Sequence, residues 1–362
     1  MQSAYFFFIL IMFLLFHCNC LYQNKNINSS LNSSFRSFQG FSFVLMIALF
    51  FGLRNPKIGV DSIAYLKWYR EGTPDVIGKD SEKGFELLMY ILHILMYGDK
   101  PFLIIMSLII SLFNLLLYKK INNEKYINYF IIQLCFYYFY IFHLSMYRQA
   151  IAIGLVGISF FNYKYKNKIG FWFYGILAFL IHYTAIIFIF FPFLNYFSKI
   201  IVSKKQHLIL MILSLLFFST NIVKLIIAKI PDFAPPVKIL KSYYLYMNLG
   251  AIHITHSHLV SFFIILIFHI NFNKIRKLNT FYLYVIHSLY FVTISLFKDS
   301  VILYDRLYFY IQIYEPVLIF EFSNIFKEKK LGKYLIYSFV LIYSLFTIFI
   351  WGPRNLIQPY YF

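Results

Sequence analysis

The chain has 362 residues, of which 61% are hydrophobic and 13% are charged, and its mean hydropathy is +0.69. Ordinary soluble domains are roughly 45–50% apolar and about 25% charged, so this composition excludes a soluble globular protein and predicts a lipid environment. The formal net charge is +19. Because the lysines and arginines gather in short segments between apolar blocks, they indicate cytoplasmic loops, and we expect lipid bilayer but no nucleic acid as a partner.

Apolar segments of membrane-spanning length follow one another along the chain. They cover residues 5–20, 39–53, 101–118, 126–142, 146–163, 170–194, 207–227, 257–272, 279–297, 304–323 and 333–351. The first is predicted as a retained helix, since it lacks a basic leader and a cleavage site. A shorter apolar segment, 85–97, rises only ~20 Å as a helix and predicts a re-entrant or interfacial helix, or a thin span.

This pattern predicts an all-α fold, a polytopic integral membrane protein with about 10–12 membrane helices, of which some could be re-entrant. No separable soluble domain stands out, so residues 1–362 are expected to form one polytopic membrane domain.

Two long loops interrupt the series, at 54–83 and at 229–256. Loop 54–83 holds five of the fourteen acidic residues, unlike the mainly basic short loops. The positive-inside rule therefore predicts that this loop, with a short helix in it, is periplasmic, and that segments 119–125 and 163–168 are cytoplasmic. The turn near residues 143–147 then lies outside.

The predicted number of membrane crossings is inconsistent with the loop charges at one place. The segments around 168 and 273 are both basic and should both be cytoplasmic, yet an odd number of apolar blocks separates them. One block must be broken, re-entrant or wrongly bounded, and the candidates are 170–194, 207–227 and 257–272.

Several polar side chains are expected to meet at the outer face. Arg148 and Arg306 each enter an apolar block within one turn of that face, and His182 lies roughly 20 Å from the cytoplasmic end of its block. The acidic loop adds Asp61 and Glu82. An intramembrane charge predicts a functional site, and the planar guanidinium binds phosphate with two parallel hydrogen bonds. A lipid-linked phosphate at the outer leaflet would match such a site.

Structural explanations stay open for each of these residues. Arg148 could be an interfacial anchor whose stem packs along apolar surface, and Arg306 could form a local ion pair with Asp305. His182 could be a packing residue, and the two loop acids could be solvated.

A second candidate lies near the C-terminal end, where Asp305, Tyr308, Gln312 and Glu315 share one helix face. Glu315 lies well inside an apolar block, where a carboxylate needs a partner or water. The stretch HITHSH at 253–258 has no accompanying cysteine or acidic cluster, so neither a metal site nor a cofactor is predicted.

Four segments occur in an order and spacing that resemble the EpsG family, multispanning proteins of bacterial exopolysaccharide and capsule clusters that are similar to Wzy-type O-antigen polymerases. These segments are IGVDSIAYLKWY (58–69), EKGFELL (82–88), YRQAIAIGLV (147–156) and LAFLIHYTAIIF (177–188). The resemblance covers roughly residues 55–310.

The first two segments match the family residue by residue, with one exception. Gly59, Asp61 and Tyr65 match a G-x-D-x-x-x-Y stretch. Residues 82–85 match an E-P-G-F stretch, with Lys83 where the family has proline.

The remaining matches include both arginines. Arg148 and Gln149 match an R-Q-x-x-A helix start, and His182 matches a phenylalanine–histidine pair although an isoleucine replaces the aromatic residue. Arg306 and Tyr308 resemble an arginine–tyrosine helix start of the family.

The resemblance implies a glycosyltransferase of the bacterial inner membrane that joins undecaprenyl-pyrophosphate-linked oligosaccharide repeat units at the outer face. Arg148 and Arg306 would bind the pyrophosphate, and Asp61, Glu82 or His182 would be the base. Other proteins of polysaccharide assembly, such as a flippase and a chain-length regulator, are implied as partners. Further site candidates are Tyr65, Gln149, Asp305, Tyr308 and Glu315.

Two other functions use the same residues. A flippase for lipid-linked sugars would bind the pyrophosphate without catalysing a reaction, but polar groups should then also line a route to the cytoplasm. A membrane acyltransferase that modifies the glycan would use His182 as its base.

Overall fold

The computed structural model describes residues 29–59, 61–72, 82–201, 203–219, 256–296 and 301–346. All regular structure in these ranges is helical, which confirms the predicted all-α fold. The apolar segment 5–20 and the loop 229–256, apart from its last residue, lie outside the described residues.

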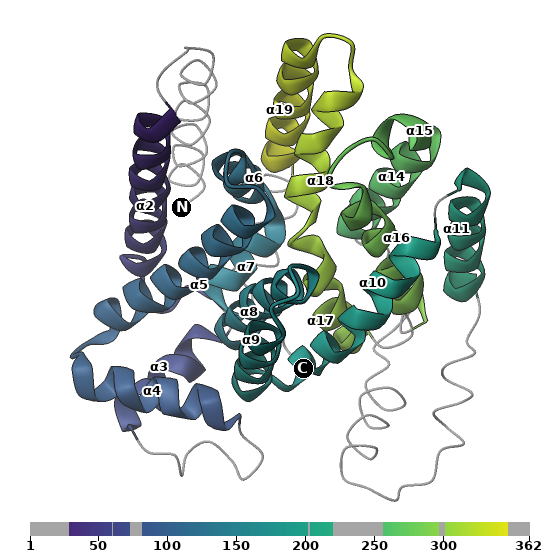
Figure 1. The fold of residues 1–362 in the computed structure, drawn as a ribbon. Helices are drawn as coiled ribbons and strands as arrows, with labels where there is room; N and C mark the ends of the chain where they lie inside the picture. The colour runs from purple at the N-terminus through teal and green to yellow at the C-terminus, as the bar shows by residue number, and fades with distance from the viewer. Residues whose placement is uncertain are drawn as a thin grey trace, which may run out of the picture. The chain divides into compact units, whose positions relative to one another are not determined.

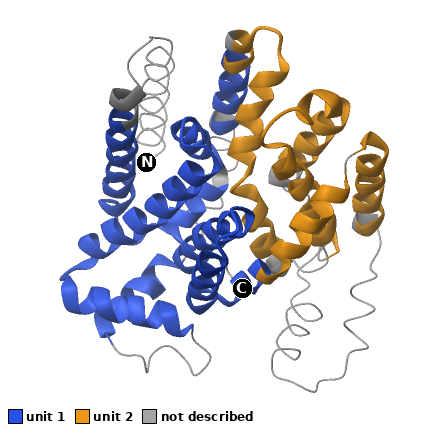
Figure 2. Ribbon diagram, in the orientation of Figure 1, with its two compact units in different colours: residues 1–188, 334–362 blue, residues 189–333 orange. Residues whose placement is uncertain are grey.

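Two compact units make up the chain, and each is described by itself (Figure 2). Unit 1 contains residues 1–188 and 334–362, and unit 2 contains residues 189–333.

Unit 1 contains most of the segments that resemble the family (Figure 1). Its described helices are α2 Ser29–Gly52, α3 Ser62–Glu71, α4 Lys83–Leu95, α5 Asp99–Ile121, α6 Tyr126–Gln133, α7 Tyr137–Leu144, α8 Tyr147–Lys164 and α9 Lys168–Ile181, followed by the start of η2 Tyr183–Phe190.

Helix α8 is the core of unit 1, because nearly all of its residues after the first turn are buried. Small residues allow the close approach of its neighbour α5. A Cβ atom on Gly154 would lie 2.8 Å from Cβ of Phe113, and one on Gly157 would lie 2.7 Å from a methyl group of Leu117. Such small-residue contacts are the usual way in which membrane helices pack tightly.

The apolar block 170–194 is not one helix. Helix α9 ends at Ile181, His182 has an extended backbone, and η2 follows. The ring of Phe188 lies 5.5 Å from that of Phe171 and 5.8 Å from that of Trp172, so the chain folds back along α9 after His182. Two passes of this block would make the number of crossings even, and this topology stays a prediction.

Unit 2 is built from shorter helices. They are α10 Phe191–Ile200, α11 Lys204–Ser219, α14 His256–Ile270, α15 Phe272–Ile275, α16 Phe281–Ser295, α17 Val301–Gln312, α18 Glu315–Glu321 and η4 Phe322–Ile325, and α19 Lys329–Phe346 leads back into unit 1. The predicted block 304–323 is divided at residues 313–314, and Pro316 sits in the first turn of α18, where its missing N–H is not needed.

Three helical stretches in the described residues are long and apolar enough to cross a membrane, namely Ser34–Gly52, Asp99–Ile121 and Tyr183–Ile200. The predicted block 126–142 is a fourth only if α6 and α7, bent by 79°, count as one broken span. Shorter apolar helices accompany them. These findings support a membrane protein, while the count of about 10–12 spans stays a prediction.

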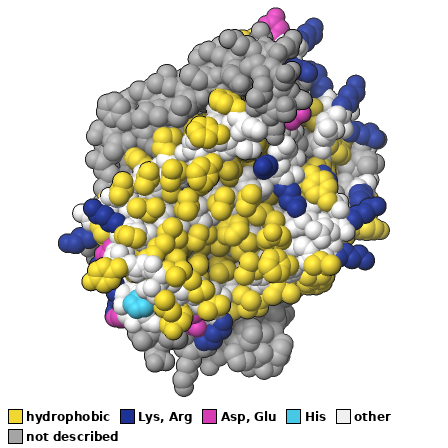
Figure 3. Space-filling view, turned by 60° about the vertical axis from the view of Figure 1, so that its left-hand side comes forward, with side chains coloured by type: hydrophobic (Ala, Val, Ile, Leu, Met, Phe, Trp, Pro, Cys, Tyr) yellow, Lys and Arg dark blue, Asp and Glu magenta, His cyan; other side chains and the backbone are white. Residues whose placement is uncertain are grey.

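The exposed surface agrees with a lipid environment. Figure 3 shows a broad patch of apolar side chains on one face of the molecule. Helix α2 alone exposes large side chains at Phe35, Phe38, Phe41, Leu45 and Leu49. Contiguous apolar surface of this kind marks contact with membrane or protein.

The chain reversal at His182 predicts the side of the membrane for the loop between α10 and α11. In a cysteine-free background, we expect Lys205→Cys and Asn123→Cys to react with an impermeant thiol reagent only after permeabilisation, because both loops are predicted to be cytoplasmic. Lys67→Cys in α3 should react in intact cells. Labelling of Lys205→Cys from outside would contradict the two-pass interpretation of 170–194.

Candidate active site around Glu82

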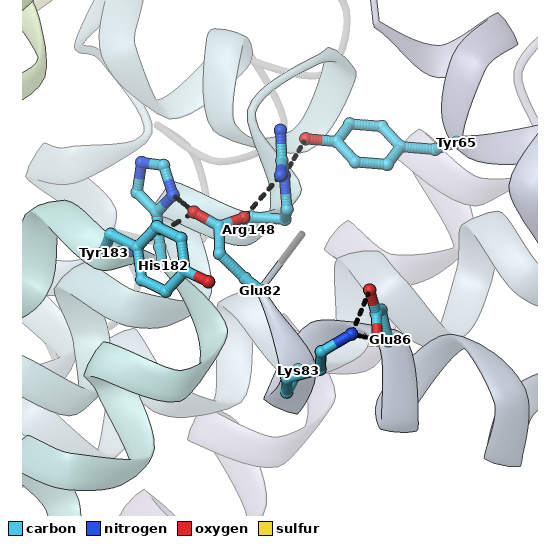
Figure 4. A network of polar contacts seen from close by, with 7 residues as sticks. All are labelled: Tyr65, Glu82, Lys83, Glu86, Arg148, His182 and Tyr183. Carbon is cyan, nitrogen blue, oxygen red and sulfur yellow. Dashed lines mark hydrogen bonds and ion pairs between the residues drawn. The ribbon is translucent and has the colours of Figure 1, made fainter. Parts of the chain in front are cut away.

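Glu82 is the centre of a polar cluster in unit 1 (Figure 4). It occupies the N-cap position of α4, and its side chain is only 6% exposed. One carboxylate oxygen, Oε1, accepts from Nδ1 of His182 at 2.5 Å and from the backbone N–H of Tyr183 at 3.2 Å. The other, Oε2, forms a close ion pair with Nη1 of Arg148. A single carboxylate therefore joins three segments that are distant in the sequence.

A glycine contact brings Glu82 to His182. A Cβ atom on Gly84 would lie 2.8 Å from the backbone carbonyl group of Leu180, so only glycine allows the first turn of α4 to touch the last turn of α9. Because α9 ends directly after this contact, the N–H of Tyr183 is left to donate to the carboxylate. The glycine of the E-x-G-F segment is thus explained by packing.

Arg148 lies in the first turn of α8, as the sequence predicts. Its Nε donates to the hydroxyl of Tyr65 at 3.3 Å, and its guanidinium carbon lies 5.5 Å from the ring centre of Trp68 and 5.9 Å from that of Phe85. Such stacking stabilises a partly desolvated cation. The side chain is 29% exposed, and within the described part of the chain Nη2 has no acceptor. Donor groups therefore remain available for an anionic ligand.

A second glycine places Tyr65. Gly59 has φ +104°, and a Cβ atom there would lie 1.9 Å from the carbonyl oxygen of Leu144, so the chain before α3 closely contacts the turn before α8. Asp61, the N-cap residue of α3, lies one turn before Tyr65 and is exposed.

The electrostatics of the cluster favour an ionised carboxylate and a neutral phenol. Burial opposes ionisation of Glu82, but the hydrogen bond and charge of His182, the charge of Arg148 and the Tyr183 N–H together hold its pKa below the ordinary value. Burial raises the pKa of Tyr65 to about 12, although the Arg148 guanidinium partly offsets it. Tyr65 therefore stays protonated near neutral pH and positions Arg148 as a neutral acceptor.

The contact with Glu82 also defines the histidine tautomer. When Nδ1–H donates to the carboxylate, the lone pair of the neutral imidazole is on Nε2. A carboxylate that holds a histidine in this way orients the ring for proton transfer. The arrangement thus combines a potential base, His182, with a partly exposed cation, Arg148, on one carboxylate.

Of the predicted site residues, Tyr65, Glu82, Arg148 and His182 form this cluster, and Gln149 is buried beside it in α8. The other candidates, Asp305, Arg306, Tyr308 and Glu315, belong to unit 2. Their predicted approach to Arg148 at one external cavity stays a prediction.

Unit 2 has a polar cluster of its own. Glu315 is fully buried and accepts from Ser261, and its Oε1 lies 3.3 Å from the hydroxyl of Tyr308 and 3.5 Å from Nε2 of His287. These residues come from α14, α16, α17 and α18. Oε1 of Glu315 therefore finds its polar partners inside the unit, whereas Oε2 is buried without a hydrogen-bond partner among the described residues. Among the described residues of the chain, no three His, Cys, Asp or Glu side chains come together as a metal site.

Sequence reasoning missed two members of the Glu82 cluster. Trp68 could have been predicted from the sequence, because it follows Tyr65 by three residues in a helical segment and therefore shares its face. Tyr183 could not have been predicted, since its backbone N–H is available to donate to Glu82 only because the helix ends at Ile181.

The fold and this cluster define a helical membrane protein with a buried carboxylate–histidine–arginine site. The sequence model of the EpsG family matches residues 37–362, and the chain belongs to that family. It is accordingly a membrane protein of polysaccharide biosynthesis. No curated protein and no solved structure matches the chain.

The ion pair predicts a large loss of stability on Glu82→Gln, because the substitution leaves Arg148 and His182 without a charged partner. Breaking a mostly buried pair costs about 3 kcal/mol. The matched control is Glu86→Gln, whose partner Lys83 is exposed, and this pair should contribute only about 0–1 kcal/mol. Thermal unfolding in detergent at pH 7 compares them, and equal losses would contradict the central role of Glu82.

The lowered pKa of Glu82 also predicts a pH dependence. A carboxylate with a lowered folded-state pKa stabilises the protein fully above its ordinary value of 4.5 and loses this contribution as the pH falls through the folded-state value. The difference in melting temperature between wild type and Glu82→Gln should therefore shrink as the pH is lowered from neutral to strongly acidic. A difference independent of pH would show that the loss comes from packing.

Proposed function

We propose that this protein is a polysaccharide polymerase that joins undecaprenyl-pyrophosphate-linked repeat units at the outer face of the bacterial inner membrane. Family membership supports the pathway. The observation that carries the proposal is Arg148, a partly exposed cation at the start of α8 that Glu82 and Tyr65 hold in place while further donors stay available.

The reaction is a glycosyl transfer. An acceptor hydroxyl oxygen bonds to the anomeric carbon of the donor sugar, and the bond from that carbon to the pyrophosphate oxygen breaks. The hydroxyl proton passes to a base, and the lipid pyrophosphate leaves with the electron pair. Catalysis therefore requires a positioned base and fixed positive charge at the leaving group.

Arg148 is proposed to stabilise the leaving pyrophosphate. Its planar guanidinium suits the phosphate oxygens, and the first N–H groups of α8 and the helix dipole act in the same direction. Arg306 is proposed as a second cation on the basis of its motif alone.

His182 is proposed as the base, with Glu82 as the residue that positions it. The Nδ1–Glu82 hydrogen bond supports this assignment over Glu82 itself, whose two oxygens are already engaged by His182, Tyr183 and Arg148. Asp61 remains an alternative base, since its carboxylate is exposed.

The decisive test of the proposal is substitution of Arg148. Arg148→Lys should lose most activity at normal membrane abundance, because lysine keeps the charge but loses the planar pair of donors. Losing a contact that strengthens in the transition state costs about a hundred- to a thousand-fold in rate. Polymer chain length, normalised to protein level, is the measurement, and Arg148→Ala should be at least as damaging.

A purely structural arginine would behave differently. Lysine would reach the interface equally well, and alanine would lower membrane abundance before specific activity. Wild-type polymer from Arg148→Lys would leave Arg148 as an interfacial anchor and end the pyrophosphate role.

Deletion of the gene separates the polymerase from the other functions. We expect single repeat units that are made and exported but not joined, visible by gel analysis of the surface glycan. Units retained on the cytoplasmic leaflet would instead support a flippase, and chains of normal length with an altered modification would support an acyltransferase.

A further inference from the structure

A second arginine of unit 1, Arg54, follows the end of α2 and donates from each of its three side-chain nitrogens. Nε donates to the carbonyl of Ile58 at 3.3 Å, and Nη1 donates to the carbonyl of Phe51. Nη2 donates to the hydroxyl of Ser62 at 2.9 Å and also to the hydroxyl of Tyr147. One guanidinium group therefore connects several segments of the chain.

Two of these contacts reach the helices that supply the geometry of Arg148. Ser62 begins α3, three residues before Tyr65, and lies on the same buried face of that helix. Tyr147 begins α8, directly before Arg148. The hydrogen bond between Arg148 and Tyr65 links the same two helices. Arg54 is thus bound to both sides of the gap that this hydrogen bond crosses.

The carbonyl group of Leu144, in the turn before α8, strengthens the connection. Its oxygen accepts from Nη2 of Arg54 at 3.4 Å and also from the hydroxyl of Ser62. The close approach of Gly59 to the same carbonyl leaves no space for another atom between them. The start of α3 and the turn before α8 are therefore held at one fixed separation.

Aromatic rings continue this connection as far as Arg148. The guanidinium carbon of Arg54 lies 5.9 Å from the ring centre of Tyr147, whose ring centre lies 5.0 Å from that of Tyr65. The guanidinium carbon of Arg148 lies 5.9 Å from the ring centre of Tyr65. Because both tyrosine rings are buried, a displacement of one is passed to the next.

A purely structural role for Arg54 would be to cap α2. The contact with the carbonyl of Phe51 serves that role, since it satisfies a backbone acceptor in the last turn of the helix. The contacts with Ser62 and Tyr147 contribute nothing to the end of α2. They require a role that extends to α3 and α8.

We infer that Arg54 is a positioning residue for Arg148: it fixes the separation of α3 and α8 at which Tyr65 holds the Arg148 guanidinium. The inference rests on the proposed function, in which Arg148 stabilises the leaving pyrophosphate. Misplacement of a reacting group by about 1 Å can cost a hundredfold in rate, so a residue that never touches the substrate can control the reaction.

Kinetics of the purified full-length protein in liposomes, with lipid-linked repeat units, test the inference. Arg54→Lys keeps the charge but cannot bind all three segments at once, and Tyr147→Phe removes only the hydroxyl that Arg54 contacts. Both should lower kcat about tenfold to a hundredfold with little change in KM, because the Arg148 contact matters most in the transition state. Arg70→Lys, at an arginine of α3 that pairs with Asp99, is the control and should leave kcat unchanged.

A double-mutant cycle separates positioning from general stabilisation. In an Arg148→Ala background, Arg54→Lys should still lower the melting temperature but should cause little further loss of rate, because the group that it positions is absent. A loss of rate by the same factor in both backgrounds would show that Arg54 only stabilises the fold and would overturn the inference.

A spectroscopic measurement tests the position of Arg148 without any substrate. The ring centre of Trp68 lies 5.5 Å from the guanidinium carbon of Arg148. The chain has three tryptophans, so fluorotryptophan labelling gives few fluorine resonances, and Trp68→Phe identifies the relevant one. Arg54→Lys should shift this resonance in the same direction as Arg148→Ala does. An unchanged resonance in Arg54→Lys would contradict the positioning role.

The same samples distinguish this inference from the proposed function. Normal polymer formation by both Arg54→Lys and Tyr147→Phe would refute the positioning role and leave the polymerase standing. A wild-type protein that forms no polymer, but whose Trp68 resonance shifts on Arg54→Lys, would support the positioning of Arg148 and refute the polymerase.

Discussion

A carboxylate that is almost removed from water must have its charge balanced, and at Glu82 this is done by an imidazole on one oxygen and a guanidinium on the other. Because His182 and Arg148 come from α9 and α8, the ion pair and hydrogen bond join the start of α4 to both helices. Two glycine contacts make this geometry possible, Gly84 against Leu180 and Gly59 against Leu144. The chemistry and the packing of unit 1 thus depend on the same few positions.

The same arrangement explains how a membrane protein can keep a partly exposed cation near its surface. Arg148 is stabilised by Glu82, by the Tyr65 hydroxyl and by aromatic rings, while part of the guanidinium remains exposed. A binding group prepared in this way needs little reorganisation when an anion arrives, which is the condition for effective electrostatic catalysis.

Much of the helical fold and several residues of the candidate site could be predicted from the sequence, because they depend on local sequence patterns. Apolar blocks predicted the helices, and the cost of burying charge singled out Arg148 and His182. The gathering of Glu82, Arg148 and His182 was predicted from loop charges and family resemblance. The break at His182 was not assigned, because residues 170–194 are mostly apolar and contain no glycine or proline at the break. The position of Glu82 as a shared partner of Arg148 and His182 depends on three-dimensional contacts that no spacing reveals.

The claim that Glu82 and Arg148 act as one unit is tested most directly by a double-mutant cycle on the rate of chain formation. Purified wild type, Glu82→Gln, Arg148→Ala and the double variant would be reconstituted in liposomes with lipid-linked repeat units. Residues of one catalytic unit are strongly non-additive, so the double variant should be about as slow as the slower single variant. Losses that multiply in the double variant would show that the two residues act independently and would contradict the account.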